Sequence, residues 1–328
     1  MSKRAVIQGI GHSVPDKVLT NADLERMVDT DDEWIVQRTG IKERRICSDE
    51  ESTSTLAIAA GKEALADAGA DPADIDIVIV STVTGDMQFP SVASLVQDAV
   101  GASNAGAFDV GAACAGFIYS LSVASSMIEA GRMENVLLIG ADALTKFVDY
   151  TDRETCVLFG DGAAAFVLKG ESGTDRGLID MVLLSDGSGA KHINVMVGGS
   201  KYPYGTPIAE GKSPYIYMAG SEVYRFAVGA MGDACCKVLE KSGMAAEEID
   251  LFVPHQANLR IIRSAAERIG LPQEKVFLNV QNYGNTSGGS IPLGLYEAAK
   301  TGRLKKGMVV MTVGFGAGLV WGANLIRW

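Results

Sequence analysis

The chain has 328 residues, of which 47% are hydrophobic and 21% are charged, and 29 basic against 40 acidic side chains give a formal net charge of −11. This composition is typical of a globular protein and excludes a disordered or collagen-like chain. The acidic balance argues against a nucleic-acid partner because it repels phosphate backbones, and no apolar run approaches the roughly 18 residues that span a bilayer.

Buried strands are predicted to alternate with helices along the chain. Strands are expected where Val-, Ile- and Leu-rich runs end at Gly, Asp or Pro, which happens at residues 5–10, 77–81, 136–139, 163–168, 178–184, 251–253, 308–313 and 320–326. Helices are expected at residues 53–68, 115–130, 221–242 and 259–269. The alternation predicts an α/β fold, with layered sheets of parallel strands buried on both faces.

A sequence echo suggests that this fold is duplicated. The helix–Gly–strand segment at 64–78 has a counterpart at 238–252, so that position 76 corresponds to position 250. The same offset maps residues 136–140 onto 310–314 and Cys114 onto Gly288. We therefore expect an N-terminal half at 1–173 and a C-terminal half at 174–328, joined through a polar, turn-rich segment.

Cysteine and histidine usage restricts the possible chemistry. The cysteines at 47, 114, 156, 235 and 236 form no Cys-x-x-Cys motif and no zinc-like spacing with histidine, so no metal site is predicted. The N-terminal segment lacks a signal-peptide core, so we expect a cytoplasmic protein with reduced thiols. Any histidine-dependent step has to use His12, His192 or His255.

Cys114 is the strongest candidate nucleophile. Small residues flank it in the run GAACAGF, and an apolar helical segment follows. A thiol at a helix N-terminus is favoured as the thiolate by the helix dipole. Burial as an ordinary core cysteine is the alternative that this local pattern leaves open.

Two further polar residues could complete a site with Cys114. His255 follows a strand that Pro254 ends, and residues leaving parallel strands point into the crevice where α/β ligands bind. Asn285 lies in the Gly-rich run YGNTSGG, which the duplication places opposite the Cys114 loop. The alternatives are a loop histidine with an ordinary hydrogen bond and a plain Asn-Gly-rich turn.

Together these segments resemble the β-ketoacyl-acyl-carrier-protein (ACP) synthase III family. The likeness rests on Cys114 in Ala-Cys-Ala-Gly-Phe, His255 in His-Gln-Ala-Asn-x-Arg and Asn285 in Tyr-Gly-Asn-Thr-Ser, and it covers essentially the whole chain. Related elongating enzymes carry a second His in place of Asn285, and thiolases carry a second Cys. The resemblance implies a thiolase fold, an internally duplicated five-layer α-β-α-β-α arrangement, and a homodimer.

The resemblance also implies a reaction, the first condensation of type II fatty-acid synthesis. An acyl-CoA, expected to be acetyl-CoA, acylates Cys114; malonyl-ACP then loses carbon dioxide, and the carbanion attacks the acyl-cysteine to give a 3-oxoacyl-ACP. His255 and Asn285 suit the charge that builds during decarboxylation because both are neutral donors. CoA thioesters are substrates, and no cofactor is implied.

Several binding residues are carried over from the family pattern. The backbone N–H groups of Cys114 and Ala317 would form the oxyanion hole for acylation, although the family has Gly at the second position. Trp34 and Arg153 match residues that hold the CoA adenine. The other matches are Arg38, Gly220 and Asn258 for CoA and pantetheine, Phe89 for the partner subunit's acyl pocket, and Gln256, Ala257, Asn258, Leu259, Arg260 and Arg263 for ACP.

An acidic chain needs a local basic patch to dock an acidic carrier protein. Arg260 and Arg263 are spaced to share one helix face, with Arg268 a turn further on, and Lys42, Arg44 and Arg45 form a second candidate patch. Ordinary solvated faces are the alternative.

Three other functions remain possible on the sequence alone. A ketosynthase of secondary metabolism would load a longer or branched starter, and its loading rates would show that preference. A papain-like hydrolase would use Cys, His and Asn to cleave peptides. A non-catalytic thiolase-fold subunit would lack the nucleophile.

Overall fold

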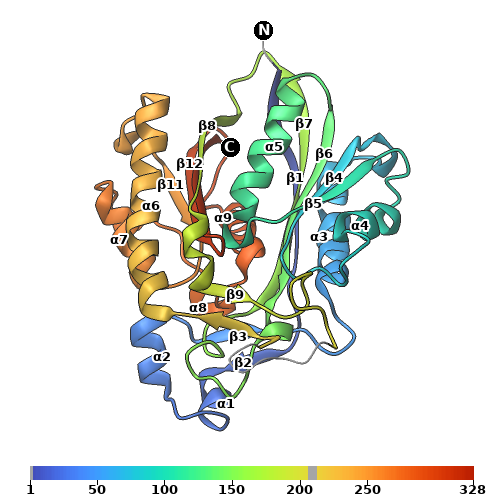
Figure 1. The fold of residues 1–328 in the computed structure, drawn as a ribbon. Coiled ribbons are helices and arrows are strands. Elements are labelled where there is room, and N and C mark those ends of the chain that lie inside the picture. Colours follow the sequence, from blue (N-terminus) through green and yellow to red (C-terminus); the bar gives the residue numbers. More distant parts are fainter. Residues whose placement is uncertain (1–2, 206–212) are drawn as a thin grey trace.

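Two β-sheets form the frame of the molecule in the computed structural model, which describes residues 3–205 and 213–328 (Figure 1). The first sheet has the order β1-β7-β6-β4-β5 and the second the order β11-β12-β13-β8. The first contains β1 (Lys3–Ser13), β4 (Ile77–Ser81), β5 (Gly106–Val110), β6 (Asn135–Ala143) and β7 (Asp161–Ser172). The second contains β8 (Gly177–Ser185), β11 (Leu251–Pro254), β12 (Val309–Gly316) and β13 (Val320–Arg327).

Both sheets are mixed, so the expectation of parallel strands is only partly right. Strand β4 pairs in parallel with β5 and β6, and β11 with β12. Strand β7 runs antiparallel to β1 and β6, and β13 runs antiparallel to β12 and β8, because no α-helix crosses over between β6 and β7 or between β12 and β13. Strand β5 was not predicted, since its half-buried residues lack a Val, Ile or Leu run.

The helices complete five layers (Figure 1). Helices α5 (Gly116–Glu129) and α9 (Ser290–Lys300) lie between the sheets and share one hydrophobic cluster with both of them. Helices α3 (Thr53–Ala68) and α4 (Val92–Val100) cover the first sheet, and α6 (Gly220–Ser242) and α7 (Leu259–Arg268) cover the second. This confirms the expected α-β-α-β-α fold. Among the described residues, no helix is long and apolar enough to cross a membrane.

The two halves repeat element by element at the offset seen in the sequence. Strands β4 and β11 begin at 77 and 251, β6 and β12 at 135 and 309, and helices α5 and α9 at 116 and 290. The order β1-β7-β6-β4 also corresponds to β8-β13-β12-β11. We propose that 1–173 and 174–328 are the two copies, since β7 ends at Ser172 and β8 begins at Gly177.

Shorter elements gather at one end of the molecule, in the lower part of Figure 1. They are α1 (Asn21–Glu25), α2 (Asp32–Thr39), α8 (Val280–Tyr283), β2 (Val18–Thr20), β3 (Glu43–Arg45), β9 (Ile193–Val195) and β10 (Ile216–Met218). A fourth hydrophobic cluster, which includes Leu24, Ile35 and Phe159, holds part of this region together.

Candidate active site

Cys114 lies in a tight turn between β5 and α5. The turn Ala113–Ala115 is a 3-10 helix, and α5 begins two residues after the thiol. Ala113 has a φ of 44°, and a Cβ on Gly116 would lie 1.9 Å from Ser81 Oγ, so a larger residue at position 116 would force the Ser81 side chain to move. Burial raises the pKa of the Cys114 thiol to about 12. The resting group is therefore a thiol, contrary to the expectation that the helix dipole alone favours the thiolate.

His255 directly follows β11 and is 1% exposed. Its backbone N–H donates to the Val313 carbonyl over 2.8 Å, which extends the pairing of β11 with β12. Neither ring nitrogen has a hydrogen-bond partner among the described residues, and the ring meets the edge of Phe315 at a centroid distance of 5.9 Å. Burial lowers the pKa of His255 to about 3. The imidazole is therefore neutral near pH 7, with one N–H to offer.

Asn285 is held by its backbone and by its side chain. Its N–H donates to the Leu158 carbonyl over 2.9 Å, and its own carbonyl accepts from Gly160 N over 3.0 Å. Its Oδ1 accepts the N–H of Ser287 over 2.9 Å. Because the oxygen of the carboxamide is engaged in this way, the Nδ2 group remains as a donor.

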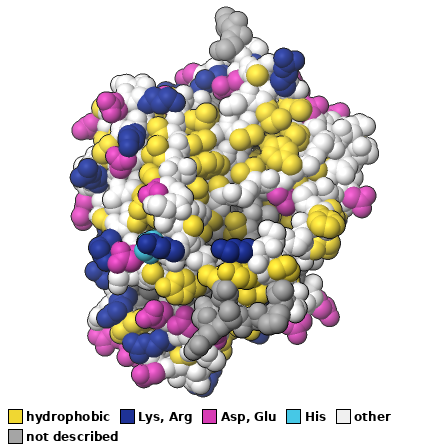
Figure 2. Space-filling view, viewed as in Figure 1, with side chains coloured by type: hydrophobic (Ala, Val, Ile, Leu, Met, Phe, Trp, Pro, Cys, Tyr) yellow, Lys and Arg dark blue, Asp and Glu magenta, His cyan; other side chains and the backbone are white. Residues whose placement is uncertain are grey.

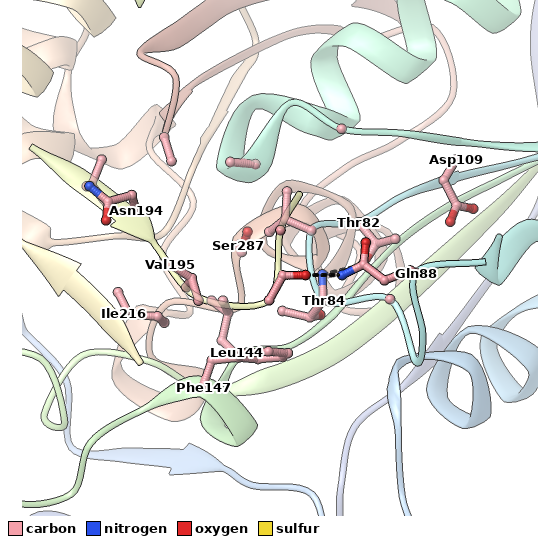
Figure 3. Close-up of a pocket in the computed structure, with 18 of the residues that line it drawn as sticks. Thr82, Thr84, Gln88, Asp109, Leu144, Phe147, Asn194, Val195, Ile216 and Ser287 are labelled. Atoms are coloured by element: carbon pink, nitrogen blue, oxygen red, sulfur yellow. Dashed lines mark hydrogen bonds between the residues drawn. The ribbon is translucent and has the colours of Figure 1, made fainter. Parts of the chain in front are cut away.

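Cys114, His255 and Asn285 line one cavity of about 140 Å³, and a larger cavity begins on the other side of the thiol. The larger one has a volume of about 650 Å³ and is drawn in Figure 3, with the apolar Leu144, Phe147 and Ile216 on one side and polar Thr82 and Thr84 on another. Cys114, Phe159 and Ile193 line both cavities. The thiol therefore stands where the two spaces meet.

The predicted CoA-binding residues gather around the smaller cavity and the neighbouring helix α2. The guanidinium carbons of Arg38 and Arg153 lie 4.5 Å and 5.2 Å from the centroid of the Trp34 ring. Asn258 Nδ2 donates to the Arg38 carbonyl over 2.9 Å. Asn258 and Gly220, the first residue of α6, both line the smaller cavity. The fold thus brings these five distant residues to one region.

Two residues expected to contact ACP are buried. Gln256 is 1% exposed; its side-chain amide donates to backbone carbonyls at 254 and 277 and accepts backbone N–H groups at 279 and 280. Ala257 belongs to the core cluster under α6 and α7. The side chain of Gln256 therefore braces the loop, while Ala257 also lines the smaller cavity, and an ACP-binding role for this segment stays a prediction.

Of the two basic patches expected from the sequence, only one is exposed. Figure 2 shows basic side chains spread over the face that carries α6 and α7. Arg260 and Arg263 are exposed on α7, as an ACP-docking face requires, and Leu259 beside them is half-buried. Arg44 is fully buried and donates to the Leu19 and Val157 carbonyls and to Asn21 Oδ1. The second candidate patch therefore does not exist as a surface cluster.

Phe89 projects from the loop between β4 and α4 and is 85% exposed, so it is not a core residue. Its neighbours Met87 and Gln88 line the larger cavity. Gln88 Nε2 donates to the Gly198 carbonyl over 2.7 Å, which joins this loop to the segment after β9 (Figure 3). Ala317 lines the same cavity as Cys114, and a Cβ on the adjacent Gly316 would lie 2.6 Å from Cys114 N.

Sequence reasoning missed a buried carboxylate beside the site. Asp142, near the end of β6, is 0% exposed and accepts five hydrogen bonds, one of them from Gly288 N. A charged residue within the otherwise apolar run 136–143 was the available signal. Arg44 carried no such signal, since nothing in the sequence separates it from Lys42 and Arg45.

A duplicated five-layer fold that places a thiol, an imidazole and a carboxamide in one cavity defines a condensing enzyme of the thiolase superfamily, an acyltransferase. The comparisons with known proteins agree. A sequence profile for 3-oxoacyl-[acyl-carrier-protein] synthase III matches residues 108–187, and the profile for the C-terminal part of that family matches residues 239–328.

Individual relatives match over nearly their whole length. A β-ketoacyl-[acyl-carrier-protein] synthase III of Caldanaerobacter subterraneus subsp. tengcongensis is 49% identical over 324 residues, 99% of this chain and 98% of that one. One from Bacillus anthracis is 48% identical over 98% of each chain. The crystal structure of 3-oxoacyl-[acyl-carrier-protein] synthase III from Aquifex aeolicus superposes with a TM-score of 0.91 at 45% identity, over 99% of this chain and 100% of that one.

The chain therefore belongs to the β-ketoacyl-ACP synthase III family. This confirms the resemblance seen in the sequence, and it rules out the papain-like alternative.

Proposed function

We propose that this protein is the initiating condensing enzyme of type II fatty-acid synthesis, working in the cytoplasm as a homodimer without a cofactor. It would transfer an acyl group from acyl-CoA, with acetyl-CoA as the expected donor, and condense it with malonyl-ACP. The products are 3-oxoacyl-ACP, carbon dioxide and free CoA. The observation that carries the proposal is the meeting of Cys114, His255 and Asn285 in one cavity that opens into a second cavity behind the thiol.

In the first half-reaction, Cys114 Sγ forms a bond to the thioester carbonyl carbon of acyl-CoA, and the bond from that carbon to the CoA sulfur breaks. The proton of the Cys114 thiol leaves on CoA. A negative oxygen forms on the way, and the backbone N–H groups of Cys114 and Ala317 are assigned to stabilise it. The acyl chain then occupies the cavity behind the thiol.

In the second half-reaction, the malonyl carboxylate leaves as carbon dioxide and its bonding pair moves toward the thioester oxygen. His255 and Asn285 Nδ2 donate to that oxygen. The low pKa of the buried His255, about 3, keeps it neutral, so it acts as a hydrogen-bond donor without becoming an acid. The α-carbon then attacks the acyl-cysteine, the carbon–sulfur bond breaks, and Cys114 leaves as a thiolate that takes up a proton from water to restore the resting thiol.

Substrate delivery is assigned to the region around Trp34. For the CoA adenine to lie between Trp34 and Arg153, the guanidinium has to move away from the ring, because a centroid distance of 5.2 Å leaves no space for a third stacked group. Asn258 and Gly220 are assigned to the pantetheine arm. Arg260 and Arg263 are assigned to ACP, and replacing both with Glu should weaken ACP use while sparing acyl-CoA loading.

The alternative function, a ketosynthase with a longer or branched starter, keeps support from the larger cavity. Its volume of about 650 Å³ exceeds what an acetyl group fills. The exposed Phe89 of the partner subunit is proposed to close this space in a homodimer, and the closed volume would decide the chain length.

The first test is intact mass after mixing the protein with acyl-CoAs of increasing length, with Cys114→Ala alongside. A gain of one acyl group that is lost in the variant would establish the nucleophile, and the preferred length would identify the starter. Absence of acylation by every donor would contradict the proposal.

A further inference from the structure

The carboxylate of Asp142 is buried without a basic partner. It forms no ion pair with any residue in 3–205 or 213–328. Its Oδ1 accepts from Thr82 Oγ1, Thr84 Oγ1, Val83 N and Thr84 N over 2.8–3.1 Å. Burial raises the pKa of this carboxyl, and the N–H groups of Val83 and Gly288 oppose that rise. Burying a carboxylate costs free energy, and an apolar side chain would fill the same space at a lower cost. We therefore asked which neighbouring groups depend on the Asp142 carboxylate.

The second carboxylate oxygen reaches across to the other half of the molecule. Asp142 Oδ2 accepts the N–H of Gly288 over 2.8 Å, a contact between residues 146 apart in the chain. Gly288 is the middle residue of the 3-10 turn Ser287–Gly289 that precedes α9. Ser287 in this turn has a φ of 48°, which is unfavourable for a residue with a side chain. The turn therefore depends on external contacts to keep its shape.

The same turn orients the carboxamide of Asn285. The N–H of Ser287, next to the one held by Asp142, donates to Asn285 Oδ1 over 2.9 Å. If the turn relaxes, this donor moves and the carboxamide of Asn285, which lines the smaller cavity, loses the contact that fixes its orientation. Asp142 itself is already saturated with donors on Oδ1, so it is poorly suited to remove the Cys114 proton.

We propose that Asp142 is a positioning residue that acts through the turn Ser287–Gly289 to fix Asn285 for decarboxylation. This inference rests on the proposed function. Asp142 serves mainly the second half-reaction, because its Oδ2 contact leads through the turn to Asn285. Its Oδ1 contacts hold residues 82–84, which line the larger cavity beside Cys114, so a smaller effect is expected on acylation.

The test is Asp142→Asn, which preserves shape but turns one acceptor oxygen into an NH2 group. In either orientation that group faces backbone N–H donors, of Gly288 or of Val83 and Thr84. We expect decarboxylation of malonyl-ACP and condensation to fall at least tenfold, while acylation of Cys114, followed by intact mass, changes less than twofold. The matched control is Asp76→Asn, because Asp76 also accepts two backbone N–H groups, at the far end of β6. It should leave both half-reactions unchanged.

A double-mutant cycle separates positioning from general destabilisation. If Asp142 acts through Asn285, then Asn285→Ala should add little to the loss already caused by Asp142→Asn. Multiplicative losses, equal loss of both half-reactions, or an unaffected decarboxylation would each overturn the inference. Should Asp142→Asn not fold, Thr82→Val removes one donor from the carboxylate and is expected to give the same pattern, about two- to fivefold. Failure of the wild type to acylate Cys114 would instead refute the proposed function.

Discussion

Two turns of this molecule are built alike and used differently. The turn Ala113–Ala115 precedes α5 and the turn Ser287–Gly289 precedes α9, at corresponding positions of the internal repeat. Ala113 and Ser287 have φ angles of 44° and 48°, and they are the only described residues other than glycine with a positive φ. The backbone is thus the same in both turns, and the difference lies in what surrounds them.

Each turn faces the strand ends of the opposite half. Beside Cys114 the repeat places His255 and Gly316; beside Gly288 it places Ser81 and Asp142. Gly316 approaches the Cys114 N–H without a side chain, whereas Asp142 accepts the Gly288 N–H. One copy therefore has no side chain facing the Cys114 N–H, as the proposed oxyanion hole requires, and the other fills the corresponding place with the Asp142 carboxylate. The internal repeat thus contains two similar turns, and only the turn at Cys114 has space beside its backbone N–H group.

The largest expected effect on activity comes from replacing the residues at the ends of strands β11 and β4, which occupy corresponding positions. His255→Ala should lower decarboxylation and condensation by about 10²–10³-fold, since one donor to the developing oxyanion is removed. Ser81→Ala at the corresponding position should change neither half-reaction, because Ser81 Oγ has no partner among the described residues. Assays of both half-reactions would check this, and a comparable loss in Ser81→Ala would show that the second copy also takes part in the chemistry.

The next effect concerns how closely each turn is packed. A Cβ on Gly140 would lie 2.2 Å from the Gly288 carbonyl oxygen, whereas a Cβ on Gly314 would lie 3.2 Å from that of Cys114. Gly140→Ala should therefore lower the free energy of unfolding by about 1–3 kcal/mol, and Gly314→Ala by less. Denaturant titration measures the free energy of unfolding of both variants. A larger loss in Gly314→Ala would mean that the turn at Gly288 is the less tightly packed of the two.

Acid should lower the free energy of unfolding through His255, which lies beside the Cys114 turn. Its folded pKa of about 3 lies below the ordinary 6.5, so between these pH values the unfolded chain binds a proton that the folded chain does not. The stability from this group is complete above about pH 6.5 and is lost as pH falls toward 3, by roughly 1.4 kcal/mol per pH unit. Subtracting the pH profile of His255→Asn should isolate this slope, and identical profiles would contradict the neutral, buried imidazole.

The smallest effect tests whether the two turns are equally strained. Ala113→Gly and Ser287→Gly should each raise the free energy of unfolding by about 0.5–1 kcal/mol, because glycine adopts a positive φ more readily. Thermal unfolding of the two variants gives the comparison. A gain in only one of them would show that the turns share a shape without sharing its strain.

The residues proposed for catalysis could be picked out from the sequence, but the contacts that hold them could not. The motifs around Cys114, His255 and Asn285 pointed to the family, and the internal repeat located Gly288. Asp142 escaped because nothing local indicates which backbone N–H will approach a carboxylate from 146 residues away. Gln256 and Arg44 read as surface groups, and their burial follows from segments elsewhere in the chain that pack over them.

The shared walls of the two cavities have a consequence for kinetics and for inhibition. Cys114, Phe159 and Ile193 line both spaces, so an acyl group stored behind the thiol leaves the smaller cavity free for the next thioester. In the proposed reaction both thioesters would occupy the smaller cavity in turn, a double-displacement order in which CoA departs before malonyl-ACP enters. A ligand attached to Cys114, with one branch in each cavity, would prevent the binding of both substrates.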